Sequence, residues 1–154
     1  MNRRELLGAA IGGASLAMAA GAALADDDHM EHMEHMEHMN HAAHMGAAKL
    51  AEAARHCAAS GDACMSHCLA LFVAGDNSIA GCARSVYQMT AMCDALARLA
   101  SANSPHLAGL AKICGEVCLD CEKECRKHEK EHELCKACAE SCAACAEECK
   151  KISA

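Results

Sequence analysis

Residues 133–149 read ELCKACAESCAACAEEC, and this stretch decides the fold. Its cysteines follow one another at steps of 3, 4, 3 and 4 residues. Such steps place side chains on one face of an α-helix, and they are the intervals at which Leu and Ile usually enter the core of a helical bundle. The stretch therefore predicts a helix whose buried face consists of thiols.

The segment 46–154 predicts three further helices of the same kind. It shows no strand alternation and consists mainly of residues with high helix propensity. Gly75 marks one turn, Ser104 and Pro105 a second, and the charged run 127–130 a third. Because short turns join neighbouring helices in opposite directions, the expected fold class is all-α, an antiparallel four-helix bundle with a cysteine-lined core. The expected helices span 47–74, 78–102, 105–127 and 131–151.

The cysteines outside 133–149 keep the helical spacing. They are separated by 7 and 4 residues in the first helix, by 11 in the second, and by 4, 3 and 4 in the third. On the second helix Val86 and Met89 continue the same face between the two cysteines. All cysteines of the chain are therefore expected in the core, as metal ligands: Cys57, Cys64, Cys68, Cys82, Cys93, Cys114, Cys118, Cys121, Cys125, Cys135, Cys138, Cys142, Cys145 and Cys149.

Fourteen cysteines on inward faces are more than ordinary packing explains. A buried Cys is a competent small hydrophobic residue, but it buries less area than Leu, so a core built of Cys is thin. A disulfide scaffold is the second structural interpretation, because the cysteine count is even. Cysteines four residues apart on one helix have poor geometry for a disulfide, but disulfides between helices are an alternative in the metal-free chain.

Thiols at this density indicate Cu(I) as the ion that the core holds, with multiple ions per chain. Two or three thiolates satisfy Cu(I), so a Cys-x3-Cys pair on one helix can hold one ion, whereas Zn(II) requires closed sets of four ligands. One Cu(I) per thiolate is neutral overall, and a neutral cluster is cheaper to bury than a charged one. A ceiling of about 14 Cu(I) ions per chain follows if every thiolate bridges two ions.

Composition and charge exclude several classes of function. The 154 residues carry 14 Lys and Arg against 21 Asp and Glu, a net charge of −7, and only 1% of them are aromatic. Such a chain repels a phosphate backbone and lacks stacking side chains, so we expect no nucleic-acid partner. The sequence shows no Ser/His/Asp set and no Gly-rich phosphate loop. The run Cys114-x3-Cys118-x2-Cys121 has the radical S-adenosylmethionine spacing, but the chain lacks the length and strands of that barrel, so we expect no enzyme.

Residues 1–25 are expected to be a twin-arginine signal peptide. Arg3 and Arg4 precede an apolar stretch rich in Ala and Gly, which ends in the small-x-small pattern of a cleavage site at Ala25. The stretch is weakly hydrophobic and no basic cluster follows it, so cleavage is favoured over a membrane anchor. The sequence thus predicts export to the periplasm of a bacterium, with no stable membrane insertion afterwards.

Residues 26–45 form a separate segment, which contains the repeat HMEHMEHMEHM from His29 to Met39. A period of three residues fits neither a helix nor a strand, so a flexible tail is expected. Thioether sulfur prefers Cu(I) and imidazole binds Cu(II), so the repeat favours metal capture, with a solvated acidic linker as the alternative. The candidate ligands here are His29, Met30, His32, Met33, His35, Met36, His38 and Met39.

Other methionines and histidines could act at the ends of the bundle. Met89 is in phase with Cys82 and Cys93, where it is either a thioether ligand or core filler. His67 lies off the cysteine face and is expected at the surface, while His128 and His132 are expected to be solvated. The candidates for end ligands are Met65, Met89, Met92, His56, His67, His106, His128 and His132.

The cysteine pattern of residues 46–154 resembles that of the copper storage proteins, specifically their exported, twin-arginine-signalled branch. The resemblance rests on Cys57-x6-Cys64-x3-Cys68, on Cys118-x2-Cys121-x3-Cys125 and on the segment 133–149. It implies Cu(I) held by thiolates inside the bundle, frequent assembly as a homotetramer, and periplasmic storage of copper for supply to cuproenzymes. In methane-oxidising bacteria that client is the membrane methane monooxygenase. The alternative function is a periplasmic copper-detoxifying buffer or a copper-transfer chaperone.

Overall fold

The computed structural model describes the backbone of residues 27–154 and the side chains from His44 onward. The described chain forms four helices and no strand: α1 (Asp27–Val73), α2 (Ala80–Ser101), α3 (Leu107–Arg126) and α4 (Glu133–Ser153). The predicted signal peptide, 1–25, lies outside the described residues. None of the described helices combines the length and the apolar character needed to cross a membrane.

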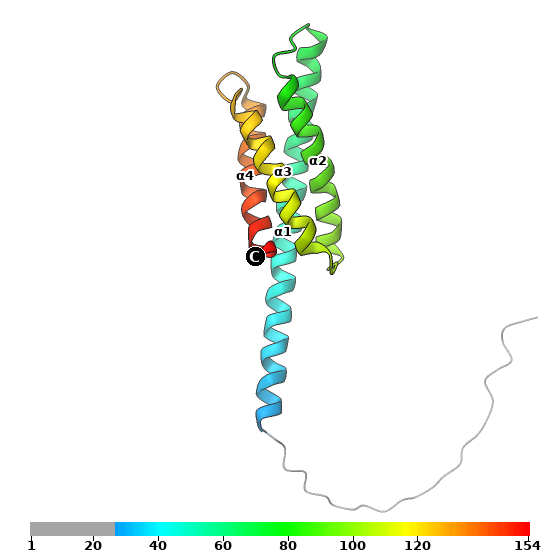
Figure 1. The fold of residues 1–154 in the computed structure, drawn as a ribbon, viewed down its shortest axis with the longest axis vertical. Helices are drawn as coiled ribbons and strands as arrows, with labels where there is room; N and C mark the ends of the chain where they lie inside the picture. Colours follow the sequence, from blue (N-terminus) through cyan, green and yellow to red (C-terminus); the bar gives the residue numbers. More distant parts are fainter. Residues whose placement is uncertain (1–26) are drawn as a thin grey trace, which may run out of the picture.

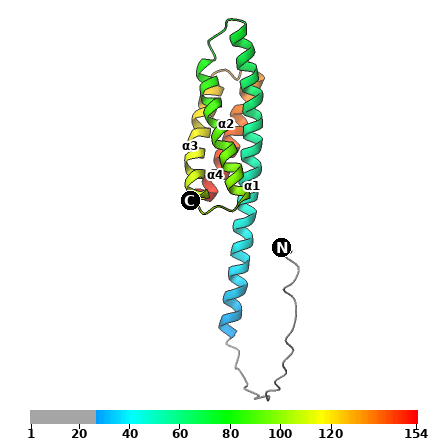
Figure 2. The same cartoon turned by 90° about the vertical axis from the view of Figure 1, so that its right-hand side faces the viewer.

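The helices run alternately up and down and form one bundle (Figure 1). Each packs mainly against two neighbours: α1 lies against α2 and α4, and α3 lies against the same two helices. Figure 2 shows the same arrangement from the side. The prediction of an all-α, antiparallel four-helix bundle is confirmed.

The turns fall where the sequence places them. Gly75 lies two residues after the end of α1 and has φ +87°, a left-handed backbone conformation that Gly adopts without steric cost. Between α2 and α3, Asn103 has φ 49°, and the Ser104 hydroxyl accepts a hydrogen bond of 3.2 Å from the His106 backbone N–H. The helix boundaries inside the bundle accordingly lie within a few residues of the predicted ones.

The start of α1 differs from the prediction. The sequence predicts a flexible tail over 26–45 and a helix from 47, whereas the helix begins at Asp27 and projects beyond the bundle (Figures 1 and 2). The repeat lacks an apolar helical face, but its Glu, Met and Ala have high helix propensity and no Gly or Pro interrupts it before Gly46. Because the packed part of α1 supplies the costly nucleus, each added residue only has to extend an existing helix.

The buried core has two chemically different parts. At the end from which α1 projects, the core is aliphatic, and we call this part the aliphatic end: Leu50, Ala54, Leu96, Ala100 and Leu107. The C-terminal turn of α4 meets α1 there, because a Cβ on Gly46 would lie 3.2 Å from Ile152 Cδ1. Cysteines fill most of the remaining core, towards the opposite end.

Candidate metal centre

The structure places every cysteine of the chain inside the bundle. Each of the fourteen side chains is at most 1% exposed, and all of them are free thiols. The sequence-based expectation that these residues share the inward faces of four helices is therefore correct in placement. We call this continuous set of fourteen side chains the sulfur column.

Within the column, sulfur atoms from different helices approach one another closely. Five groups of three or four cysteines have all their Sγ atoms within 4.8 Å of one another, and together they include every cysteine except Cys68. The largest group takes one cysteine from each helix. The groups are Cys57, Cys93, Cys118 and Cys145; Cys64, Cys82 and Cys135; Cys64, Cys125 and Cys138; Cys114, Cys145 and Cys149; and Cys121, Cys138 and Cys142.

Shared members join the five groups into two sets, and the Sγ atoms of Cys57 and Cys142, 3.7 Å apart, connect the sets. Cys64, Cys138 and Cys145 each belong to two groups. Between helices, the Sγ atoms of Cys82 and Cys125 are 3.3 Å apart, and the Sγ atom of Cys93 lies 3.8 Å from that of Cys114. An ion bound to one group is therefore next to the ligands of the following group.

Burial and thiol–thiol hydrogen bonds set the protonation of the column. Removal from water raises the pKa of Cys68 to about 11 and the pKa of Cys135 to about 12, because it disfavours the charged thiolate. Hydrogen bonds from the Cys125 thiol and then the Cys64 thiol lower the pKa of Cys82. A metal ion that enters must displace protons from the thiols whose pKa is raised.

Three histidines lie at the end of the column opposite the aliphatic end. His67 Nε2 and His132 Nδ1 are 3.0 Å apart, and the rings of His128 and His132 have centroids 6.4 Å apart. All three side chains are half-buried, so the expectation of a surface His67 and of solvated His128 and His132 is corrected. We call these residues the histidine end.

The histidine end has a sequence signal that spacing on one helix does not reveal. His128 comes three residues after Cys125 and His132 three residues before Cys135, and each is joined to that cysteine by a backbone hydrogen bond of 3.0 Å. The turn between α3 and α4 thereby places both histidines next to Cys125 and Cys135. Only tertiary packing then brings His67 of α1 against them.

The remaining candidate end ligands are spread over the bundle. Met89 is fully buried within the column, whereas Met65 and Met92 are half-buried and pack against the core. His56 and His106 are exposed. The candidate ligands from His29 to Met39 lie on the projecting part of α1, where the structure describes the backbone alone.

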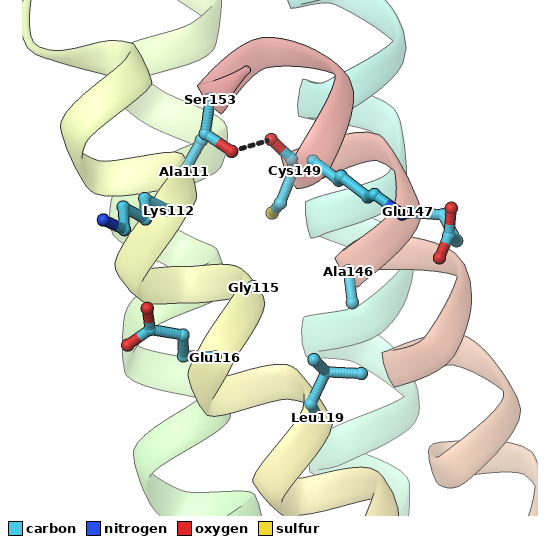
Figure 3. Close-up of a pocket in the computed structure, with 10 residues that line it drawn as sticks. Ala111, Lys112, Gly115, Glu116, Leu119, Ala146, Glu147, Cys149 and Ser153 are labelled. Atoms are coloured by element: carbon cyan, nitrogen blue, oxygen red, sulfur yellow. Dashed lines mark hydrogen bonds between the residues drawn. The ribbon is translucent and has the colours of Figure 1, made fainter.

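A surface groove between α3 and α4 comes close to the column without containing it (Figure 3). Its floor is formed by Gly115, Ala146 and Cys149, and Cys149 is only 1% exposed. A Cβ on Gly115 would lie 3.2 Å from Cys149 Cβ, so the glycine lets α3 approach α4 closely. This contact separates the thiols from the solvent in the groove.

Comparisons with known proteins agree on one family. The family model for copper storage proteins matches residues 41–154. The chain is 30% identical to the uncharacterised cysteine-rich protein YhjQ of Bacillus subtilis (strain 168) over 87 residues. The match covers 56% of this chain and 77% of that protein.

Similar solved structures are copper storage proteins. The apo form of copper storage protein 3 from Bacillus subtilis superposes with a TM-score of 0.61 at 28% identity, over 69% of this chain and 97% of that one. A Cu(I)-bound copper storage protein superposes with a TM-score of 0.62 at 30% identity, over 68% of this chain and 95% of that one. A cytosolic copper storage protein from Streptomyces lividans, with five coppers, superposes with a TM-score of 0.63 at 27% identity, over 73% of this chain and 95% of that one.

These comparisons correct the predicted location. The sequence predicts a periplasmic protein, but the similar Streptomyces lividans protein is described as cytosolic. The assignment to the periplasm is therefore contradicted and is withdrawn.

Proposed function

Because the chain belongs to the copper storage protein family, we propose that it stores multiple Cu(I) ions by thiolate coordination inside its four-helix bundle. The observation that carries this proposal is the sulfur column, in which thirteen of fourteen buried thiols fall into groups within 4.8 Å. The proposed ligands are the cysteines of the column. A copper-transfer chaperone would instead present one or two thiols at its surface, and here every cysteine is buried.

The chemistry of the column favours Cu(I) over Zn(II) as its cargo. Four of the five cysteine groups have three members, which suits the low coordination number of Cu(I) and falls short of a closed tetrahedral zinc site. Filling the column with one Cu(I) per thiolate also leaves no net charge to bury. Divalent ions at the same density would leave an uncompensated positive charge inside the bundle.

An anaerobic titration of the reduced chain against a competing Cu(I) chelator tests storage. We expect roughly ten or more tightly bound ions per chain, near the ceiling set by the ligands. The thiols are counted before and after the titration, so that oxidation is not mistaken for weak binding. Uptake of only one or two ions would refute storage and favour a carrier or buffer with a single site.

We also propose that copper reaches the column through the histidine end. The opposite end is closed by Leu50, Leu96 and Leu107, which offer no ligand, whereas His67 directly precedes Cys68 in the sequence and contacts His132. Imidazoles that hold an ion briefly would pass it to thiols, which bind Cu(I) more tightly.

Replacing both imidazoles, His67→Ala with His132→Ala, is expected to slow copper loading roughly tenfold while leaving the final number of ions unchanged. Stopped-flow absorption of the copper–thiolate band measures the rate. The matched control is His56→Ala, since His56 is exposed and distant in sequence from this end. An unchanged loading rate in the double variant would place the route elsewhere.

Loading is expected to release protons, because thiols with a raised pKa are neutral at pH 7. Cys68 and Cys135, with pKa values of about 11 and about 12, must each lose a proton before they bind the metal as thiolates. Affinity for Cu(I) should therefore fall as the pH falls, about tenfold per pH unit for each proton released. Titration in a pH-stat counts the protons directly, and copper uptake without proton release would contradict this expectation.

Three finer points stay predictions. They are the supply of stored copper to cuproenzymes, metal capture by the repeat from His29 to Met39, and assembly as a homotetramer. Apolar side chains that could take part in assembly are exposed on the bundle surface, among them Val73, Tyr87 and Leu119. Light scattering during gel filtration measures the number of chains per particle.

A further inference from the structure

Met89 is the one methionine whose sulfur lies within the sulfur column among the described side chains. Its side chain is fully buried, and its Sδ atom lies 3.3 Å from Cys57 Sγ and 3.6 Å from Cys93 Sγ. Both cysteines belong to the group that draws one thiol from each helix. The thioether is thus in contact with two of the proposed copper ligands.

The position of Met89 on α2 fills a gap in the lining of the column. Cys82 and Cys93 are eleven residues apart, a distance of about 16 Å along a helix axis. The fully buried residues between them are Val86 and Met89. Met89 is therefore the residue through which α2 presents sulfur to the middle of the column.

Gly61 on α1 provides the space that the Met89 side chain occupies. A Cβ at Gly61 would lie 2.6 Å from Met89 Cε and 2.5 Å from Thr90 Cγ2, closer than packed atoms tolerate. Glycine inside a helix is unfavourable relative to Ala, so its presence between Cys57 and Cys64 calls for a packing reason. The room left for the Met89 methyl group supplies that reason and fixes the thioether beside Cys57.

We propose that Met89 is a ligand for one Cu(I) ion, held together with the Cys57 and Cys93 thiolates; this rests on the proposed function. The Sγ atoms of the two cysteines are within 4.8 Å of each other. If the Cys57–Cys93 separation is at its upper bound of 4.8 Å, the point equidistant from the three sulfur atoms lies about 2.4 Å from each. This distance is close to the ~2.3 Å of a metal–thiolate bond.

A thioether is also the right third ligand for charge. When a first Cu(I) binds, the two thiols release two protons, and the site carries one net negative charge until neighbouring ions share its thiolates, because the thioether is neutral. A third thiolate would raise that charge to two in a fully buried layer, at a higher desolvation cost. Met89 therefore completes the coordination of the ion without adding charge.

X-ray absorption at the selenium edge of the copper-loaded, selenomethionine-labelled chain tests this proposal, in a background where Met30→Leu, Met33→Leu, Met36→Leu and Met39→Leu remove the thioethers of the repeat. A direct copper neighbour of selenium is expected in this background, and the copper contribution should fall when Met89→Leu is added, because that change keeps the volume and removes the sulfur. Met92→Leu, a change on the same helix at a half-buried position, is the matched control and should retain the contribution. The Met89→Leu chain should bind about one ion fewer at a given chelator concentration.

Two results would overturn the role of Met89. One is a copper contribution at selenium that Met89→Leu leaves unchanged, and the other is the absence of any such contribution in the loaded background chain. Should Met89→Leu fail to fold, as judged by circular dichroism, the double variant Met65→Leu with Met92→Leu in the same background answers the same question, because Met89 is then the one methionine left against the bundle core. If the wild-type chain itself takes up only one or two ions, the proposed storage function fails, which is a different result from full uptake without a copper–selenium bond.

Discussion

Loading the reduced chain with Cu(I) is expected to raise its melting temperature by roughly 30 °C or more. The metal-free core is thin, because cysteines occupy the layers where Leu and Ile stand in an ordinary bundle. Metal that binds the folded chain alone adds stability in proportion to the logarithm of its free concentration over Kd.

The size of this shift follows from the number of ions. Four ions, each at a free concentration of about 100 times Kd, together contribute about 11 kcal/mol. For a chain of this length, each kcal/mol moves Tm by about 2–4 °C. The ten or so ions proposed for the column make the expected shift a lower bound.

Calorimetry of the reduced chain, with and without copper and in the absence of oxygen, measures the shift. A control with the same chain and Mg²⁺ should show no change, because hard cations prefer oxygen ligands. A rise of only a few degrees would mean that copper binds outside the core or binds the unfolded thiols equally well.

The second large effect concerns the aliphatic end, which should carry most of the stability of the metal-free chain. Truncation of a fully buried leucine, Leu96→Ala, is expected to lower the free energy of unfolding by about 3 kcal/mol. The loss combines the lost burial of the side chain with the cavity left behind. Tm of the metal-free chain should fall by roughly 6–12 °C.

Urea unfolding of the reduced, metal-free chain measures this loss as a shift of the midpoint at constant slope. Leu69→Ala is the matched control, because Leu69 is 55% exposed and its truncation removes little buried area. Copper should restore most of the lost Tm in Leu96→Ala, since metal that binds only the folded chain stabilises the bundle as a whole. Equal losses in both variants would show that the aliphatic end has no special role.

The parts of this molecule that depend on local periodicity could be predicted from the sequence, and the parts that depend on packing between helices could not. Steps of three and four residues suffice to place Cys135 and Cys149 on one helix face, and the turn residues suffice to separate the four helices. Which cysteines meet across the bundle depends on the relative height of the helices, which no spacing within one helix encodes. The groups of the column therefore emerge only in the structure.

Two further differences have the same physical origin. The repeat at the start of α1 has no helical apolar face, so periodicity predicts a tail, yet intrinsic propensity and a preformed helix extend α1 to Asp27. The spacing on its own helix predicts His67 as an ordinary surface residue, but the turn between α3 and α4 brings His132 within 3.0 Å of it. In both cases a neighbouring segment decides the outcome.

The up-and-down order of the helices has a consequence for the time course of folding. Helices that follow one another in sequence pack against each other, so the contacts are local and α1 with α2, or α3 with α4, can close as a hairpin. Chains with such local contacts fold in microseconds to milliseconds, roughly, whereas disulfides form in seconds to hours. The fourteen thiols are therefore enclosed in the core before disulfides can form, and the newly made chain folds with every cysteine still reduced.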